Sequence, residues 1–152
     1  MIRNYFFLIL CIFIVFFAYS EEAEEDERVF PPQAVLAAAY RGDLETMREI
    51  LAEGPDKNMR DAFGATALHV AIFQPDIAMV KLLLESGFDP NAKATRNGYT
   101  PLHNAVAANN VDAARLLLQY GADKNIRNLD RLTAYDMAVK EDKRPLVLIL
   151  YR

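Results

Sequence analysis

Residues Thr100–Asn125 read TPLHNAVAANNVDAARLLLQYGADKN, and this stretch decides the fold because the chain repeats it. Thr66–Asn91 aligns with it almost without gaps, as TALHVAIFQPDIAMVKLLLESGFDPN. Gln33–Asn58 and Thr133–Arg152 align in the same way, and the four copies start 33, 34 and 33 residues apart. Self-similarity at a fixed period near 33 indicates stacked structural repeats, since one such unit cannot bury its apolar face alone.

Each copy predicts a short first helix. Thr66, Thr100 and Thr133 stand at the start of their copies, where a hydroxyl can satisfy an exposed helix N–H group. Pro101 follows Thr100 and suits the first helical position, because its ring presets the backbone. Apolar residues then recur at helical spacing, which gives the helix one buried stripe.

A second helix should follow in each copy, at Ile77–Ser86 and Val111–Tyr120 in the two middle ones. These helices should stop at Gly87 and Gly121, which can adopt the left-handed conformation that ends a helix. Polar, turn-prone segments come next, and the second of them carries one extra residue. They cover residues 58–64, 91–98 and 125–131.

The tetrapeptide Thr100-Pro101-Leu102-His103, the leucine run Leu116–Leu118 and the ending Gly121-Ala122-Asp123 are similar to the ankyrin repeat. The resemblance covers nearly everything from about Gln33 to Arg152. It implies an all-α solenoid of helix–turn–helix repeats joined by hairpin fingers, with two full and two capping repeats. The repeats expected are 33–65, 66–99, 100–132 and 133–152.

Three departures from the family pattern affect the expected structure. Pro75 and Asn109 replace the glycine that usually separates the two helices, and proline cannot adopt positive φ. The turn around Pro75 must therefore be built differently. Asp136 stands where His69 and His103 stand in the middle copies, and the first copy lacks the threonine start.

Residues 1–20 differ from the repeats and predict a secretory signal peptide. Arg3 supplies a positive start, and Tyr5–Tyr19 is an unbroken apolar run of fifteen residues. Ala18 and Ser20 place small residues three and one before a cut after Ser20. The alternative is an uncleaved membrane anchor, for which a spanning helix needs about 20 apolar residues. Either way the repeats lie outside the cytosol.

Residues 21–32 predict a disordered leader, since Glu21–Glu27 holds six acidic residues and Pro31 and Pro32 follow. The leader is either a spacer or a charged docking arm. Cys11 is the single cysteine of the chain. A chain cleaved after Ser20 therefore has neither a disulfide framework nor a thiol catalyst.

The charge balance argues against a nucleic-acid partner. Without residues 1–20 the chain has 16 Lys and Arg against 21 Asp and Glu, and beyond Arg28 both counts are 15. A near-neutral solenoid offers no basic stripe to phosphates. Cations do line the predicted fingers, but Asp61 and Asp130 lie among them, so we interpret them as ordinary solvated charges. They are Arg60, Lys93, Arg96, Arg127 and Arg131.

The chain shows no recognisable catalytic or metal-binding set. His69 and His103 are its two histidines and lie one repeat apart. A zinc site or a general base would need further ligands or a nucleophile beside them. In ankyrin repeats this imidazole hydrogen-bonds the backbone of neighbouring repeats, so the resemblance implies a structural role. We therefore expect no enzyme activity, no metal and no cofactor.

The resemblance implies that a partner lies in the concave groove formed by the fingers and the exposed side of the first helices. Tyr40, Phe63, Phe73 and Tyr99 stand where repeats of this family often carry polar residues, and exposed aromatic anchors are typical of binding hot spots. The alternative is that Phe63 and Tyr99 pack locally over the fingers. The set expected to contact a partner is Tyr40, Arg41, Phe63, Phe73, Gln74, Arg96, Tyr99, Leu129 and Leu132.

These features predict a monomeric, non-catalytic adaptor that is exported to the periplasm or secreted and binds another protein. Small exported bacterial proteins that this chain resembles either support an envelope enzyme or act as immunity proteins against a secreted toxin. Two alternatives stay open. One is a structural envelope protein tethered to the membrane by residues 5–19, and the other is a secreted ankyrin effector that acts on a host.

Overall fold

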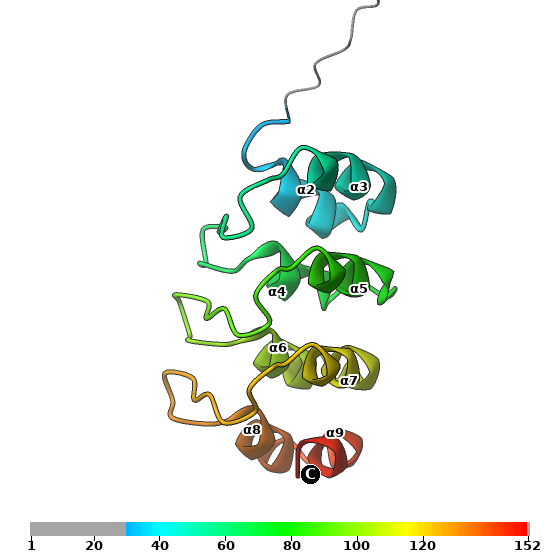
Figure 1. Ribbon diagram of the computed structural model, residues 1–152. Helices are drawn as coiled ribbons and strands as arrows, with labels where there is room; N and C mark the ends of the chain where they lie inside the picture. Colours follow the sequence, from blue (N-terminus) through cyan, green and yellow to red (C-terminus); the bar gives the residue numbers. More distant parts are fainter. Residues whose placement is uncertain (1–29, 152) are drawn as a thin grey trace, which may run out of the picture.

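The structure is a computed structural model that describes residues 30–151, and this part of the chain is all-α. Its helices form four antiparallel pairs that stack on one another, and the loops between pairs project from one side (Figure 1). The predicted solenoid is therefore confirmed, whereas the signal peptide and residues 21–29 of the leader lie outside the described residues. The helices are α2 (Ala34–Arg41), α3 (Leu44–Ala52), α4 (Ala67–Ala71), α5 (Ala78–Glu85), α6 (Pro101–Ala107), α7 (Val111–Gln119), α8 (Ala134–Lys140) and α9 (Arg144–Tyr151).

The first helices begin at the predicted caps. Thr66, Thr100 and Thr133 have extended backbone at the N-cap, and each forms a capping box with the third residue of its helix. Pro101 is the first residue of α6, as expected. The first copy differs because Gln33 makes no side-chain hydrogen bond to the start of α2.

The second helices end at left-handed glycines. Gly87 and Gly121 have φ angles of 80° and 85°, as the sequence predicted. Helix α5 is one residue shorter at each end than the predicted 77–86, and α7 ends one residue before the predicted Tyr120. The earlier ends of both helices lie in terminal turns, where helix bounds are least sharply defined, whereas the later start of α5 belongs to the turn around Pro75.

The turn between the two helices of a copy has the same form in three of the four copies. Gly42, Asn109 and Asp142 have positive φ angles of 67°, 53° and 51° at equivalent positions. The backbone N–H of the following residue then donates to a carbonyl five residues earlier, as from Asn110 to Ala105 over 2.8 Å. Asparagine and aspartate tolerate this conformation better than other residues with a Cβ atom.

In the second copy the chain makes the same turn without a residue of positive φ. Helix α4 has five residues and ends at Ala71, whose carbonyl accepts from the Gln74 N–H over 3.1 Å. Pro75 follows, and α5 begins one residue later than the register of the other copies requires. The Asp76 carboxylate accepts from the Ala78 N–H over 2.8 Å and so satisfies the start of α5.

The fingers stack on one another through backbone contacts. Gly64 and Gly98 have positive φ, and a Cβ atom on Gly64 would lie 1.9 Å from the Thr95 hydroxyl of the next finger. A Cβ on Gly98 would lie 2.9 Å from the Leu129 nitrogen. The equivalent residue of the third finger is Arg131, with φ 63°. No further finger follows within residues 30–151, so its side chain has room.

The extra residue of the second finger lies inside its hairpin. The Ala94 N–H donates to the Tyr99 carbonyl over 2.7 Å, and this pair encloses four residues. In the first finger the pair from Asp61 to Ala65 encloses three. The Arg96 N–H donates to the Phe63 carbonyl over 3.2 Å and joins the first two fingers, and the Leu129 N–H of the shorter third finger makes the equivalent contact to the Asn97 carbonyl over 3.0 Å.

Both histidines link one copy to the next. The His69 Nδ1 accepts from the Thr66 N–H over 3.2 Å, so the proton is on Nε2, which donates to the Tyr99 carbonyl over 3.0 Å. His103 repeats this arrangement with Thr100 and with the Leu132 carbonyl at 3.1 Å. Each imidazole thus fastens its helix start to the base of the following finger.

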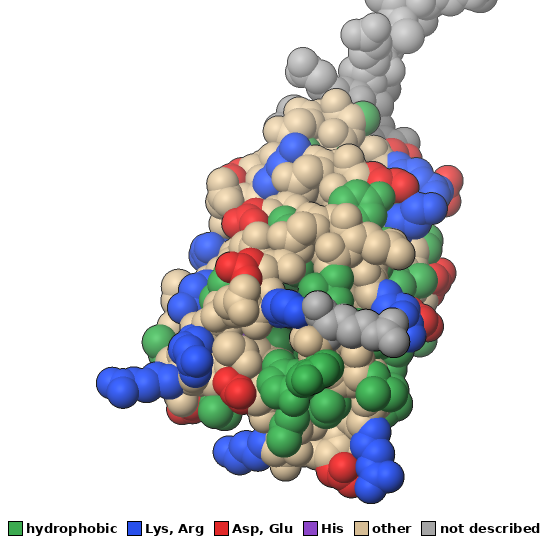
Figure 2. Space-filling view, turned by 60° about the horizontal axis from the view of Figure 1, so that its bottom comes forward, with side chains coloured by type: hydrophobic (Ala, Val, Ile, Leu, Met, Phe, Trp, Pro, Cys, Tyr) green, Lys and Arg blue, Asp and Glu red, His purple; other side chains and the backbone are tan. Residues whose placement is uncertain are grey.

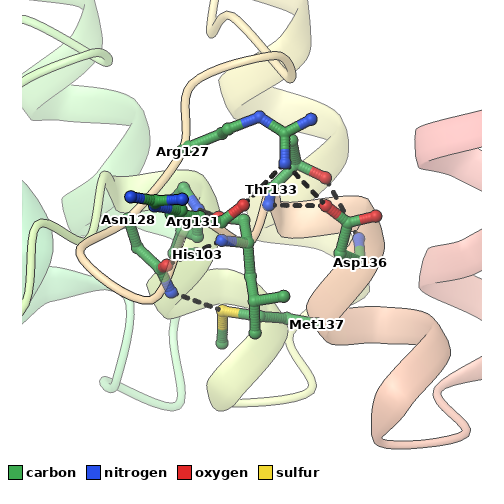
Figure 3. A network of polar contacts seen from close by, with 8 residues as sticks. His103, Arg127, Asn128, Arg131, Thr133, Asp136 and Met137 are labelled. Carbon is green, nitrogen blue, oxygen red and sulfur yellow. Dashed lines mark hydrogen bonds and ion pairs between the residues drawn. The ribbon is translucent and has the colours of Figure 1, made fainter.

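In the fourth copy Asp136 replaces the histidine and makes only the contact to the threonine at its own helix start. Its Oδ2 accepts from the Thr133 N–H over 2.9 Å, and its own N–H donates to the Thr133 hydroxyl over 3.1 Å. Arg127 lies 3.7 Å from the same carboxylate and also donates to the Arg131 carbonyl over 2.6 Å (Figure 3). A carboxylate is sufficient here, because within residues 30–151 no later finger offers a carbonyl to a second donor.

Leu117 is the residue of the leucine run that lies fully in the core. Leu117 is completely buried, and α7 packs against both α5 and α9. We expect Leu117→Ala to lower the free energy of unfolding by about 2–5 kcal/mol, because it removes apolar contacts and leaves a cavity. Urea unfolding measures this loss, and the neighbouring exposed Arg115→Ala should change stability by less than about 0.5 kcal/mol. Equal effects of the two substitutions would contradict the burial of Leu117.

The histidines predict a specific pH dependence. Burial lowers the pKa of both His69 and His103. In the unfolded chain a histidine has a pKa of about 6.5, so as the pH falls through that value the unfolded state takes up protons that the folded state resists. The stability provided by the neutral imidazoles is therefore complete above about pH 6.5 and is lost as the pH falls toward the lower folded values.

We expect the free energy of unfolding to decrease between about pH 7 and pH 5.5, and His69→Ala or His103→Ala to reduce that slope. At pH 7 each substitution should cost about 1–3 kcal/mol, because backbone groups lose their partners. Urea titrations at several pH values test both effects. Added zinc or chelator should leave the melting temperature unchanged, and a chelator-sensitive melt would instead indicate a metal ligand.

Candidate protein-binding face

The first three copies line a pocket of about 330 Å³ beside the first finger, and Asn104 is its one residue from the third copy. Its lining comes from the first finger and from the first helices and the turns after them, on the side of the stack from which the fingers project (Figure 1). Four of the nine residues expected to contact a partner meet there. The lining residues are Tyr40, Asp61, Phe63, Ala65, His69, Val70, Phe73, Gln74 and Asn104.

Three aromatic rings form the apolar rim of this pocket. Tyr40, Phe63 and Phe73 are 53%, 52% and 59% exposed, although each is a large hydrophobic residue. They come from the end of α2, from the first finger and from the turn after α4. The stack thus brings together three rings that are between 10 and 33 residues apart in the sequence. Clustered exposed apolar side chains mark interaction sites.

Hydrogen bonds hold the polar side of the pocket in place. The Tyr40 hydroxyl donates to Asp61 Oδ2 over 2.6 Å, and Gln74 Nε2 donates to the Tyr40 carbonyl over 3.0 Å. The other Asp61 oxygen accepts from the backbone N–H groups of Phe63 and Ala65, over 2.8 and 2.9 Å. Because these contacts link α2, the first finger and the turn after α4, the pocket is formed before any partner arrives.

The Tyr40–Asp61 contact joins a neutral donor to a charged acceptor. Burial acts to raise the pKa of Asp61, but the hydrogen bonds from Tyr40 and from the backbone of Ala65 and Phe63 outweigh it, so this pKa lies below its usual value. The same hydrogen bond, together with burial, raises the pKa of Tyr40. Near neutral pH Asp61 is therefore ionised and Tyr40 keeps its proton.

Arg96 reaches back from the second finger to cover part of the Phe63 ring. Its guanidinium carbon lies 4.9 Å from the ring centroid, which is a cation–π contact. About half of the Phe63 surface is still exposed, so part of this side chain packs against the second finger and the rest is open to a partner. Arg41 lies elsewhere, in a smaller hollow of about 160 Å³ beside Gly42 and Pro75.

Two residues of the expected set are less open than their positions in the family pattern implied. Tyr99 is half-buried, and its ring stacks on the His103 imidazole with centroids 5.5 Å apart. Leu132 is also partly buried against the core. Their carbonyls accept the bonds from His69 and His103, so both residues are held at finger bases. Leu129, by contrast, is 65% exposed on the third finger.

Sequence reasoning missed two polar residues of the pocket. In the sequence Asp61 stands out only as an acidic residue among the finger cations, and Asn104 follows the TPLH tetrapeptide without any motif of its own. Asn104 Nδ2 donates to the His69 carbonyl over 3.2 Å, which ties the third copy to the pocket floor. The signal for Asp61 was its place before Phe63-Gly64, where an aspartate favours a side-chain turn.

The pocket offers no free proton-transfer group among the described residues. His69 lines it, but both ring nitrogens are occupied by the contacts to Thr66 and Tyr99. Within residues 30–151 no three His, Cys, Asp or Glu side chains are grouped so that they could hold a metal ion. What the pocket presents is an apolar surface with fixed polar groups at one side.

Three of the five finger cations, Arg60, Lys93 and Arg127, donate to backbone oxygens. Arg60 donates to the Gly64 and Lys93 carbonyls over 2.7 and 2.8 Å, and Lys93 donates to the Arg127 carbonyl over 2.9 Å. They cross-link successive fingers and stiffen the wall of the groove.

Across residues 30–151, no helix combines the length and the apolar character needed to cross a membrane.

Comparison with known proteins identifies the repeat. Residues 35–128 match the family described as ankyrin repeats, in three copies. A mouse 60 kDa lysophospholipase is 40% identical over 68 residues, which are 45% of this chain and 12% of that protein. The potassium channel AKT1 of Arabidopsis thaliana is 44% identical over 63 residues, covering 41% and 7%. Human mitochondrial disaggregase is 38% identical over 58 residues, covering 38% and 8%.

The chain thus spans about a tenth of the length of these relatives, whose names describe unlike activities. What they share with this chain is a short stretch of similar sequence and not one chemistry. The family match covers more than half of the chain, and the structure shows the helix pairs, capping boxes and stacked fingers that such repeats require. The chain belongs to the ankyrin repeat family, whose repeats typically form non-catalytic protein-binding modules.

Proposed function

We propose that this chain is a non-catalytic, exported adaptor that binds another protein through its concave face. The observation that carries this proposal is the aromatic pocket of about 330 Å³ beside the first finger. Tyr40, Phe63 and Phe73 expose more than half of their surface there, although solvation of such rings is unfavourable. A partner that covers them recovers that free energy.

The chemistry of the pocket describes the group that would enter it. Its rim is aromatic and its floor includes Val70, so an apolar side chain of the partner fits best. Ionised Asp61 and the Gln74 amide lie beside the rings and can orient a donor next to that side chain. This combination of aromatic anchors with a few placed polar groups is typical of the centre of a protein interface.

Rigidity supports the same role. The bonds between Tyr40 and Asp61, between Gln74 and Tyr40, and between the first two fingers hold the groove in one arrangement. A preformed site loses less conformational entropy when a partner binds. Binding can therefore be tight without a conformational change in this chain.

Export rests on the sequence of residues 1–20 and completes the proposal. An exported domain that binds a protein without catalysing a reaction acts in one of two ways. It supports the activity of the protein that it covers, or it blocks that activity. In the envelope or periplasm these two outcomes correspond to support of an enzyme and to immunity against a toxin. Both use the same face, so identifying the partner distinguishes them.

The first test concerns the pocket. Phe63→Ala and Phe73→Ala should each weaken binding of the partner by about 1–4 kcal/mol, because each removes an anchor ring. Thermal stability should change much less, because both rings are more than half exposed. The matched control is Tyr120→Ala, since Tyr120 is also a partly exposed aromatic residue but lies at the end of α7, away from the pocket.

The partner for this measurement can be trapped with a photo-crosslinking amino acid at position 73, with position 120 as the control, and then purified for calorimetry. The expected result is a product from position 73 and none from position 120. Lost stability with unchanged affinity in Phe63→Ala and Phe73→Ala would show that the rings are local packing, and that the concave-face proposal is wrong.

A separate test concerns export. Intact-mass spectrometry of protein from fractionated cells should find a chain that begins at Glu21 outside the cytosol, because the apolar run and Ala18 and Ser20 favour cleavage there. A chain that keeps Met1 and fractionates with membranes would support the tethered alternative. A chain that keeps Met1 in the cytosol would refute export, whatever the result at the pocket.

A further inference from the structure

The side chains that line the aromatic pocket already use their hydrogen-bond donors. The Tyr40 hydroxyl and the His69 Nε2 each donate to an oxygen of this chain. Gln74 and Asn104 each donate an amide N–H, to the Tyr40 carbonyl over 3.0 Å and to the His69 carbonyl over 3.2 Å. The lining is therefore poorly suited to an anion or to any group that only accepts hydrogen bonds.

The acceptors of the pocket are not all used, and they include its one charge. Asp61 accepts from the Tyr40 hydroxyl and from two backbone N–H groups, whereas a carboxylate has about four acceptor sites. Asn104 Oδ1 accepts no hydrogen bond within residues 30–151. Burial lowers the pKa of His69, which leaves Asp61 as the one lining side chain that is charged near neutral pH. The lining thus combines aromatic rings, free acceptors and a negative charge.

The finger does not need this charge for its own fold. Asn128 occupies the position in the third finger that Asp61 occupies in the first, five residues before a threonine cap. Its Oδ1 accepts from the Leu132 N–H over 3.0 Å, as Asp61 accepts from the Ala65 N–H over 2.9 Å. A neutral amide therefore supports the same turn. The Asp61 carboxylate places a charge at the pocket that the turn does not require.

The stack does not need the aromatic rings either. Tyr40 and Phe73 occupy equivalent positions in the first two copies, and the third and fourth copies carry Ala107 and Lys140 there. All four residues are exposed, so packing between repeats does not select a ring at this position. The face of an aromatic ring is negative and attracts a cation that lies within about 6 Å of its centroid.

The cations near the pocket are engaged outside it. The Arg96 guanidinium lies 4.9 Å from the Phe63 centroid, which shows that this ring accepts a guanidinium, but Arg96 is not a lining residue. Arg60 donates to the Gly64 and Lys93 carbonyls. Neither arginine therefore neutralises Asp61 from inside the pocket.

Charge elsewhere on the molecule is mixed. Figure 2 brings the C-terminal end of the stack forward and shows basic and acidic side chains interspersed on that face. The whole chain has a net charge of −4, so its long-range field favours a cationic partner only in a general way. Selection of a particular cation requires a local site, and the aromatic pocket provides one.

We infer that the pocket binds an arginine side chain of the partner, an inference that rests on the proposed function and names the group that enters. The arginine methylenes lie against Val70 and the rings, while the guanidinium stacks on a ring and donates to Asp61 and Asn104. One arginine thus supplies both the apolar group and the donor that the pocket fits. Lysine fits less well, because its ammonium is more strongly hydrated and cannot stack.

A capped amino acid tests the inference directly. The probe is N-acetyl-arginine amide, added to the isotope-labelled full chain in a mild non-ionic detergent because residues 5–19 are apolar. Nuclear magnetic resonance should show saturable shifts of the backbone amides of Ala65, Phe73 and Gln74, with a Kd on the order of 10 mM or tighter. N-acetyl-citrulline amide has nearly the same shape without the charge, and at matched ionic strength it should bind about tenfold more weakly or less. N-acetyl-lysine amide should also bind more weakly than the arginine probe.

Two variants distinguish a cation site from a merely apolar hollow. Asp61→Asn should weaken binding of the arginine probe by about tenfold, because it removes the charge and keeps a residue that supports the turn at Asn128. Phe73→Leu should weaken it by about fivefold, because it keeps apolar bulk and removes the ring face. The matched control is Asp130→Asn, an exposed acid of the third finger, which should change binding by less than about twofold. Circular dichroism should be unchanged in all three variants.

Equal binding of the arginine and citrulline probes would overturn the inference, because the pocket would then recognise shape without charge. Equal binding of the lysine probe would overturn the choice of arginine. The inference also fails if no amide of the pocket shifts, or if Asp61→Asn and Phe73→Leu bind the arginine probe as the wild type does.

Partner affinity separates this inference from the proposed function. The partner trapped through position 73 should bind Asp61→Asn about tenfold more weakly than the wild type. If Phe73→Ala weakens the partner and Asp61→Asn does not, the pocket is the binding face and the arginine inference is wrong. If neither variant changes the affinity, the concave-face proposal fails, and the inference that rests on it fails as well.

Discussion

The structure depends on the contact between one repeat and the next. No helix pair here has a core of its own, because fully buried residues such as Leu68, Leu102 and Leu117 belong to one continuous cluster that runs through the stack. Apolar burial provides the main free energy of that contact, and the histidine bonds give it direction. His69 and His103 each join a helix start to the base of the next finger, so the fingers follow the helices in a fixed register.

The binding face is a consequence of this stacking. Tyr40, Phe63 and Phe73 lie in three different elements, and they meet because the first finger folds back over the ends of α2 and α4. One of the contacts that hold the pocket, the bond from Gln74 to the Tyr40 carbonyl, also joins the first two copies. The groove is therefore as rigid as the stack itself, and a partner meets a surface that needs no rearrangement.

The fourth copy shows which features of a repeat depend on its neighbour. Its polar residues have changed where a following finger is absent from the described chain. Asp136 replaces a histidine, and Arg131 replaces a glycine at which a Cβ atom would clash with the next finger. Its apolar residues have not changed in the same way, because Val139 and Tyr151 remain hydrophobic although they are exposed. Within residues 30–151 the fourth copy thus lacks the polar contacts to a following finger, whereas Val139 and Tyr151 have the apolar character of their equivalents in earlier copies.

The sequence by itself determined the fold class, the register of the four copies, the threonine caps and the glycine helix ends. These features depend on local chemistry and on spacing, which a one-dimensional pattern preserves. Only the tertiary structure decided how the chain turns at Pro75, because that turn relies on Asp76 and on a shifted start of α5. Only the structure separated Tyr99, which stacks on His103, from the open rings of Tyr40 and Phe73. Equivalent positions in a repeat differ in exposure when their neighbours differ, and those neighbours lie about 30 residues away in the sequence but in direct contact in space.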